Sequence, residues 1–125
     1  MKYGIYYAYW EKEWNGDYKY YIDKISKLGF DILEISCGAF SDYYTKDQEL
    51  IDIGKYAKEK GVTLTAGYGP HFNESLSSSE PNTQKQAISF WKETLRKLKL
   101  MDIHIVGGAL YGYCLLYTSP SPRDA

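Results

Sequence analysis

The order of short apolar runs and amphipathic segments along this 125-residue chain limits its fold more than any other feature. Four runs rich in β-branched, aromatic and aliphatic residues have the length of strands that are buried on both faces. We expect these strands over residues 2–8, 30–36, 62–67 and 102–106. A helical pattern separates each strand from the next, and strands that alternate with helices form a parallel sheet with right-handed crossovers.

Each separating segment carries apolar residues at helical spacing. The first segment begins after Asn15-Gly16-Asp17 and ends at Gly29, a residue type that commonly stops helices. Its apolar stripe consists of Tyr18, Tyr21, Ile22, Ile25 and Leu28. The stripes of the second and third segments consist of Leu50, Ile53 and Ala57, and of Ile88, Trp91, Leu95 and Leu98. We therefore expect three helices, each of which packs one apolar face on the sheet.

Two architectures begin with this order of elements. A doubly wound sheet normally carries a glycine-rich phosphate-binding turn after its first strand. Here that position holds YYAYWEKEW, which is aromatic and contains no G-x-G-x-x-G pattern. A TIM barrel fits better, although a complete barrel takes roughly 250 residues. The sequence therefore predicts an α/β fold that is the N-terminal half of a (β/α)8 TIM barrel, with about four parallel strands and three helices.

Composition narrows the partners of the chain. Its formal net charge is -1 and its Lys and Glu residues are interspersed, so a small neutral ligand fits better than nucleic acid. We find neither a signal peptide nor an apolar stretch of membrane-spanning length, and we expect a cytoplasmic protein without membrane contact. Cys37 and Cys114 are too few for a disulfide scaffold, and we expect both to be unpaired.

Aromatic residues make up 17% of the chain, which is more than a core alone requires. Fourteen of them are tyrosines, which lie mainly toward the N-terminus. Aromatic rings with polar tips suit stacking against sugars, and they equally suit an aromatic-rich core. Composition leaves these two interpretations open.

The last twelve residues differ in character from the rest. From Cys114 the chain reads CLLYTSPSPRDA, which has no helical or strand periodicity. Residues 114–124 also match, in order, the translation of a transposase adapter used in preparing sequencing libraries. We therefore expect residues 1–113 to form the half-barrel and residues 114–125 to be a non-native tail. Resequencing the source locus should show coding sequence that continues past Tyr113, whereas a stop codon there would contradict this expectation.

Four stretches of the sequence resemble one enzyme family. They are MKYGIYYAYWEKEW, KLGFDILEISC, YAKEKGVTLTAGYGP and KLMDIHIVGGALYGY, and together they resemble the D-allulose (D-psicose) and D-tagatose 3-epimerases, especially those of clostridial type. Each stretch includes the carboxyl end of a predicted strand, where TIM barrels bind their substrates. The resemblance covers residues 1–113 and implies a xylose isomerase-like TIM barrel. It also implies an isomerase that interconverts D-fructose and D-allulose, or D-tagatose and D-sorbose.

The resemblance places the reaction chemistry beyond this chain. In the family, a divalent metal, manganese or cobalt, polarises the ketose while one Glu removes the C3 proton and a second Glu delivers a proton to the opposite face. The metal is needed because a C–H beside a carbonyl is too weak an acid for an unaided carboxylate. Its ligands match positions after Tyr113. We therefore expect no catalytic residue, metal or activity in this chain, and a homo-oligomer for the full-length enzyme.

The resemblance also assigns residues to substrate binding. Tyr6 and Trp14 match an aromatic wall around the ketose. Gly67 matches a glycine at which the backbone approaches the sugar. Ala109 and Leu110 match residues that line the far end of the substrate chain. The alternative for the four side chains is ordinary core or loop packing, and the alternative for the glycine is the requirement of a turn.

Other reactive residues have weaker assignments. We expect His71 to be exposed in a loop, and His104 to be a packed structural histidine in the fourth strand. Cys37 has no neighbouring partner, which favours a buried and inert thiol. Glu34 faces the substrate end of the second strand, but one carboxylate forms neither a catalytic pair nor a metal site. Cys114 stands where the family has a Trp, which agrees with a change of sequence after residue 113.

Two other interpretations compete with the epimerase. A zinc endonuclease of abasic DNA shares the superfold, but it would carry several metal-binding histidines and a basic surface, and this chain has neither. A non-catalytic, sugar-binding half-barrel would have two unpaired sheet edges and would need self-association. Size-exclusion chromatography and hydrogen exchange of residues 1–113 test the second alternative. A compact monomer with protected strands would contradict our expectation of aggregation or partial folding.

Overall fold

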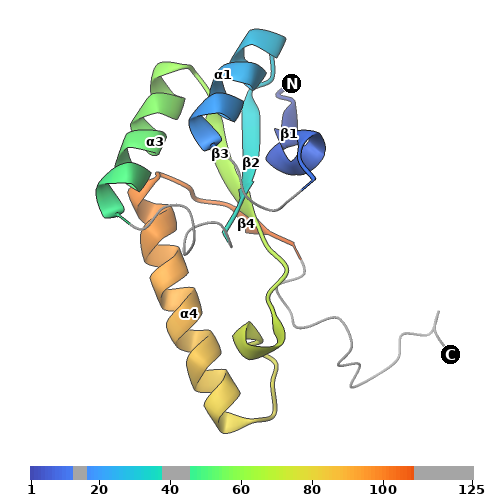
Figure 1. Cartoon of the computed structure of the whole chain (residues 1–125), viewed down its shortest axis with the longest axis vertical. Coiled ribbons are helices and arrows are strands. Elements are labelled where there is room, and N and C mark those ends of the chain that lie inside the picture. The colour runs from blue at the N-terminus through green and yellow to red at the C-terminus, as the bar shows by residue number, and fades with distance from the viewer. Residues whose placement is uncertain (13–16, 38–45, 109–125) are drawn as a thin grey trace, which may run out of the picture.

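The structure is a computed structural model that describes residues 1–12, 17–37 and 46–108 (Figure 1). Its strands are β1 (Gly4–Tyr6), β2 (Ile32–Ser36), β3 (Thr63–Gly67) and β4 (Val106–Gly107). Its α-helices are α1 (Tyr18–Leu28), α3 (Asp47–Glu59) and α4 (Pro81–Leu100). Two short 3-10 helices, η1 (Tyr7–Trp10) and η2 (Phe72–Glu74), follow β1 and β3.

The described strands form one parallel sheet, as predicted. Their order in the sheet, β1-β2-β3-β4, is also their order along the chain. Because right-handed crossovers all turn the same way, a sequential strand order places successive helices on the same face of the sheet. Figure 1 shows α1 and α3 side by side on one side of the sheet, and the two helices are in contact. A doubly wound sheet reverses its strand order and covers both faces, so the observed order favours a barrel.

The core lies between the sheet and the helices. Leu33 and Ile35 of β2 and Leu64 and Ala66 of β3 are buried on the face toward α1 and α3. The helix residues packed in the same cluster include Ile22, Ile25, Leu50, Ile53 and Ala57. Burial of a Leu or Ile side chain contributes about 1.5–3 kcal/mol. This apolar layer is therefore the main source of stability in the described part of the chain.

Helix α1 starts and ends at the predicted signals. The Asp17 carboxylate accepts a hydrogen bond from the backbone N–H of Lys19 at 3.1 Å and caps the first turn. Gly29 adopts a left-handed conformation with φ 86° and closes the last turn. The predicted stripe residues Tyr18, Tyr21, Ile22 and Ile25 are buried. The prediction is wrong for Leu28, which lies in the last turn and is 58% exposed.

The tyrosine-rich N-terminus divides between core and surface. β1 ends at Tyr6, two residues before the predicted end, because the chain turns into η1. The ring of Tyr7 is buried and makes edge contacts with the rings of Tyr18 and Tyr21, with centroids 5.4 and 5.9 Å apart. Three other tyrosines are mainly exposed, namely Tyr3, Tyr9 and Tyr20. An aromatic core therefore explains part of the tyrosine excess and leaves part of it on the surface.

The prediction of a strand over residues 102–106 is confirmed only at Val106 and is wrong for residues 102–105. Asp102 adopts a left-handed conformation with φ 59°, and the Ile103 N–H donates to the Leu98 carbonyl at 3.0 Å. A hydrogen bond of this kind closes the C-terminus of a helix, so these residues end α4. The Ala66 N–H donates to the Ile105 carbonyl at 2.9 Å, and β4 itself begins at Val106.

Helix α4 packs through a different set of residues than its hydrophobicity predicts. Its buried residues are Ala87, Trp91, Thr94 and Leu98. The predicted burial of Trp91 and Leu98 is confirmed. The prediction is wrong for Ile88 and Leu95, which are 46% and 54% exposed. The smaller Ala87 and Thr94 occupy the buried face in their place. Figure 1 shows that η2 and the N-terminal half of α4 extend past the carboxyl end of β3.

Candidate substrate-binding face

The face of the sheet opposite the helices carries polar and small residues toward its carboxyl end. Residues paired in neighbouring strands lie on the same face, and successive residues of one strand alternate between faces. Two rows of paired residues cross this face, first Tyr6, Glu34 and Thr65, and then Ser36, Gly67 and Gly107 nearer the carboxyl end. Leu33 and Ile35 alternate with them and face the core. In a closed barrel, the side away from the helices is the barrel interior.

Glu34 and Gly67 approach each other closely on this face. A Cβ atom added to Gly67 would overlap Oε1 of Glu34 and lie 3.1 Å from its carboxyl carbon. The Glu34 carboxylate therefore occupies the space that a side chain at position 67 would need. Gly67 does not have a positive φ, so a turn does not require glycine here. A larger residue at this position would therefore have to displace the flexible end of the Glu34 side chain.

Tyr6 is the pairing partner of Glu34 at the end of β1. Its side chain is half-buried, and burial raises the pKa of its hydroxyl above the ordinary value of 10.0. A hydrogen bond with Ser36 lowers this pKa, and the charge of Glu34 raises it further. The hydroxyl therefore stays protonated at neutral pH and can both donate and accept a hydrogen bond.

The structure tests the position of only some predicted site residues. Tyr6 and Gly67 lie on the same face of the sheet at its carboxyl end, as a substrate-binding role requires. Trp14, Ala109 and Leu110 lie outside the described residues. The substrate-binding roles of all five stay predictions.

Glu34 lies with Tyr6 and Gly67 on this face, although we predicted no binding role for it from the sequence. The sequence does contain a feature that singles out Glu34. Glu34 is a lone charged residue in the apolar strand ILEIS, and a glycine ends the next strand. The pairing of Ser36 with Gly67 is what brings the two together. That register is not visible in either strand alone.

The other reactive side chains are buried in the core, already have a bonding partner, or are exposed away from this face. Cys37 is free and buried against the core, and burial raises the pKa of its thiol to about 12. His104 is 78% exposed and bonds to the Asp102 carboxylate at 2.9 Å, so the prediction of a packed histidine is wrong. His71 is exposed, as expected, and its backbone N–H donates to Glu74 at 2.8 Å.

Metal ligands do not gather within the described ranges. No group of three or more His, Cys, Asp or Glu residues there could hold a metal ion. Around Glu34, the two rows supply hydroxyls and glycines rather than further carboxylates or imidazoles. The described part of the chain thus does not fit the metal site that the resemblance implies. That this chain binds no metal stays a prediction.

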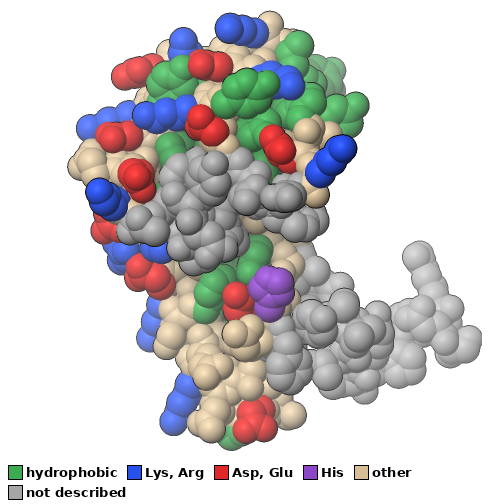
Figure 2. Space-filling model, viewed as in Figure 1, with side chains coloured by type: hydrophobic (Ala, Val, Ile, Leu, Met, Phe, Trp, Pro, Cys, Tyr) green, Lys and Arg blue, Asp and Glu red, His purple; other side chains and the backbone are tan. Residues whose placement is uncertain are grey.

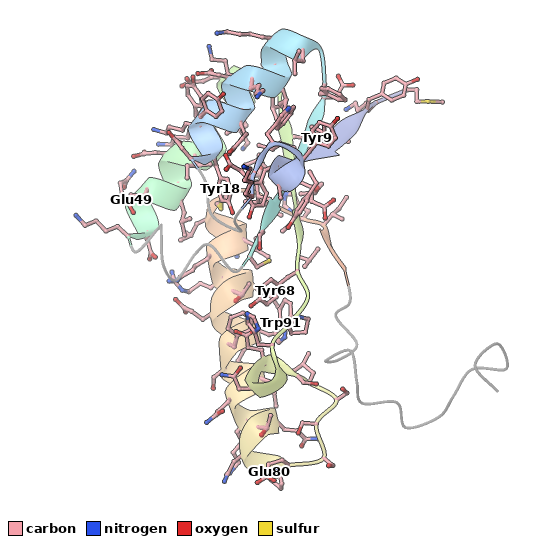
Figure 3. All side chains as sticks on the ribbon, turned by 45° about the vertical axis from the view of Figure 1, so that its right-hand side comes forward. Tyr9, Tyr18, Glu49, Tyr68, Glu80 and Trp91 are labelled. Carbon is pink, nitrogen blue, oxygen red and sulfur yellow. The ribbon has the colours of Figure 1, made fainter. Side chains whose placement is uncertain are left out.

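A second group of side chains lies beyond the carboxyl end of β3, where Figure 3 shows Tyr68 and Trp91 close together. The ring of Tyr68 lies 5.7 Å from that of Phe90 and 6.1 Å from that of Trp91. The Tyr68 hydroxyl donates to the Glu74 carboxylate at 2.7 Å. The Trp91 indole N–H donates to the Glu74 carbonyl at 3.2 Å. These contacts hold the segment after β3 against α4.

Charges of both signs are spread over the surface. Figure 2 shows Lys and Arg side chains interspersed with Asp and Glu on the face in view. Arg96, for example, pairs with Asp47 at 2.8 Å and with Glu93 at 2.6 Å. This face has no large basic patch of the kind that binds nucleic acid. In the part of the chain that the structure describes, no helix is long and apolar enough to cross a membrane.

Comparison with known proteins relates the chain to one group of enzymes. A D-psicose 3-epimerase of Enterocloster bolteae is 60% identical to it over 113 residues, which is 90% of this chain. D-psicose 3-epimerases of Ruminiclostridium cellulolyticum and Agrobacterium fabrum are 49% and 44% identical over the same length. The chain is a homologue of the D-psicose 3-epimerases. It spans 38% of the length of each of these relatives. No protein-family model matches it.

Solved structures of D-psicose 3-epimerases also match the fold of this chain. The structure with D-tagatose from Clostridium cellulolyticum H10 matches 99% of this chain and 43% of its own, with a TM-score of 0.86 and 44% identity. A D-psicose 3-epimerase structure in the presence of D-fructose gives a TM-score of 0.85 and 42% identity. An L-ribulose 3-epimerase, at 17% identity and a TM-score of 0.77, shares the fold. The predicted N-terminal half of a TIM barrel is thus confirmed.

Proposed function

We propose that residues 1–113 are the N-terminal part of a ketose 3-epimerase, an isomerase that inverts carbon 3 of a small ketose. The observation that carries this proposal is the 60% identity to a D-psicose 3-epimerase over 113 residues. A TIM barrel alone would not support it, because this fold hosts many reactions. The proposed substrates are D-fructose and D-psicose, with D-tagatose and D-sorbose as a second pair.

In this proposal, the described half-barrel binds and orients the sugar. The polar face lies at the carboxyl end of the sheet, where TIM barrels hold their substrates. The Tyr6 ring offers an apolar surface for the carbon chain, and its protonated hydroxyl offers a hydrogen bond. The predicted contacts of Trp14, Ala109 and Leu110 would complete this binding surface.

We further propose that the proton transfers depend on residues after 113, so that this chain alone is inactive. The described residues provide one carboxylate on the polar face and no metal-binding group. Deprotonation beside a carbonyl needs a positioned base and a stabilised negative charge. The complete enzyme would bind manganese or cobalt through residues outside this chain and would act as a homo-oligomer.

A completed protein tests this function. It is either the complete gene product that contains residues 1–113, or a chimera in which residues 1–113 are followed by the remainder of the Enterocloster bolteae relative. With manganese present, we expect it to convert D-fructose into D-psicose, as measured by chromatography, and we expect EDTA to remove this activity. The 125-residue chain should form no product under the same conditions.

Two results would change this assignment. If the completed protein forms no C3 epimer from any ketose tried, it is not a ketose 3-epimerase. If the 125-residue chain binds D-fructose as a compact monomer, the non-catalytic sugar-binding half-barrel becomes the better description.

A further inference from the structure

We propose that the Glu34 carboxylate accepts a hydrogen bond from a hydroxyl of the bound ketose, and that position 67 is a glycine in order to make room for it. This inference rests on the proposed function as a ketose 3-epimerase. It adds a substrate-binding residue that neither the sequence motifs nor the comparisons assign.

The Glu34 side chain leans toward the carboxyl end of the sheet. Glu34 pairs with Thr65, whereas Gly67 lies one row nearer the carboxyl end of the sheet. Because the carboxylate reaches the space beside Gly67, its side chain leans toward that end. Substrates of TIM barrels bind at the carboxyl end of the strands. The carboxylate therefore points toward the proposed substrate rather than into the middle of the barrel.

The Glu34 carboxylate has no hydrogen-bond donor and no ion-pair partner among the residues that the structure describes, and its oxygens remain accessible to solvent there. The side chain is half-buried, in a strand whose neighbouring residues Leu33 and Ile35 are core. A carboxylate that is partly removed from water needs hydrogen-bond donors to offset the lost hydration. A polyhydroxylated ligand supplies such donors.

The side chains around Glu34 favour a sugar over a cation as its ligand. The residues paired in the two rows with Glu34 and Gly67 are Tyr6, Thr65, Ser36 and Gly107, and none of them carries a charge at neutral pH. A divalent cation would require further charged or imidazole ligands. Sugar hydroxyls are neutral donors, and a bond from a hydroxyl to a carboxylate is stronger than one between neutral groups.

Glu34→Gln in the completed protein tests the inference directly. Gln keeps the shape of the side chain but removes the negative charge. Loss of a hydrogen bond to a charged group corresponds to about a tenfold to hundredfold change in affinity. We expect KM for D-fructose to rise by about this factor, with a smaller change in kcat. Glu34→Asp, which is shorter by one methylene, should give an intermediate KM.

Deoxy sugars identify the hydroxyl that Glu34 binds. D-fructose analogues that lack the hydroxyl at carbon 1, 4, 5 or 6 keep the reacting carbons 2 and 3. For the analogue without the bound hydroxyl, the parent and Glu34→Gln proteins should have the same KM. For the other analogues, the difference between the two proteins should persist. A purely structural role of Glu34 would not produce this selectivity.

Gly67→Ala tests whether the glycine acts through Glu34. The nearest atoms to the added methyl group all belong to Glu34, so the substitution should displace the carboxylate and raise KM about tenfold. When Glu34 is first replaced by Ala, Gly67→Ala should have almost no further effect on KM. Gly69→Ala is a matched control, because a Cβ there meets nothing within 4 Å.

The possible results separate this inference from the proposed function. An active completed protein in which Glu34→Gln leaves KM and the deoxy-sugar pattern unchanged would overturn the inference alone. If the completed protein is inactive, calorimetric titration with D-fructose replaces KM in the same comparison. Weaker binding by Glu34→Gln would then support the inference although the epimerase function had failed. Equal binding, or no binding by either protein, would overturn the inference.

Discussion

The face of the sheet toward the helices is apolar, whereas the opposite face carries hydroxyls, glycines and one carboxylate at its carboxyl end. Leu33, Ile35 and Cys37 of β2 belong to the core cluster. Glu34 and Ser36, which alternate with them, lie in the polar rows. The same short strand therefore contributes to both faces because successive side chains point in opposite directions.

This difference suggests that stability and substrate binding are separable in the sheet. Substitutions on the helix-covered face should change the free energy of unfolding and leave substrate affinity nearly unchanged. Substitutions on the polar face should do the reverse.

The rate of Cys37 alkylation should show how completely the helix-covered face excludes water. With a thiol pKa of about 12 instead of 9.0, the reactive thiolate at pH 8 is rarer by roughly a thousandfold. We expect iodoacetamide to label Cys37 about a thousandfold more slowly in the native completed protein than in urea, as followed by peptide mass spectrometry. A cysteine at an exposed position, as Tyr9→Cys, should react much faster in the native state. Equal native rates at the two positions would contradict the burial of Cys37 on the helix-covered face.

Leu33→Ala should cause the largest loss of stability in this comparison. Leu33 is fully buried, and truncation of such a residue leaves a cavity that costs about 2–5 kcal/mol. Thr65→Ala, on the opposite face of the neighbouring strand, should cost about 1 kcal/mol or less. Urea denaturation of the completed protein measures both values. Similar losses at the two positions would show that both faces contribute equally to stability.

The sequence predicts the carboxyl ends of the two central strands well, because their apolar runs stop where the strands stop. The runs ending at Ser36 and Gly67 give the carboxyl ends of β2 and β3 correctly. Their starts lie slightly later than predicted, since the N–H of Phe30 closes α1 and that of Val62 closes α3. Because the polar rows lie at the carboxyl ends of these strands, their place in the fold follows from the sequence.

Other features depend on contacts that one segment does not reveal. Residues 102–106 have a strand-like sequence. Asp102 nevertheless adopts a left-handed conformation, and the Ile103 N–H bonds back to Leu98, so the first of these residues end α4. The exposure of Ile88 and Leu95 follows from the way α4 packs through smaller residues. Likewise, the approach of Glu34 to Gly67 requires the register between two strands. Local patterns predict the elements, whereas these features arise when the elements meet.

Tyr68→Phe should have a smaller effect, which is localised beyond the sheet. It removes the hydroxyl that donates to the Glu74 carboxylate, a kind of bond that contributes about 1.5–3 kcal/mol. We expect a loss near the lower value, because the ring contacts with Phe90 and Trp91 remain. Hydrogen exchange should quicken in η2 and in the first half of α4, while β2 stays protected. Tyr9→Phe, at a surface tyrosine, is the control and should change neither measurement.

The smallest expected effect is that of the exposed charges around Asp102. Lys58, at 2.9 Å, and His104 hold the pKa of this carboxyl below its ordinary value of 3.8. Because the folded pKa lies below the unfolded one, the stabilisation is present above the unfolded pKa and is lost as the pH falls through the folded pKa. Asp102→Asn, which retains a residue type that tolerates the left-handed conformation, should therefore slightly destabilise the protein at pH 6.

As the pH is lowered toward 2, the effect of the substitution should shrink, because protonation of folded Asp102 removes the charge on which the stabilisation depends. Urea denaturation at the two pH values measures the change, and added salt should reduce the effect at pH 6 because both partners are exposed. Asp52→Asn removes an equal charge from α3, where the carboxylate accepts from the Gln48 amide, and it serves as the control. If Asp102→Asn destabilises the protein equally at both pH values, its effect comes from the backbone conformation and not from charge. The ion pair between Lys58 and Asp102 would then contribute nothing measurable to stability.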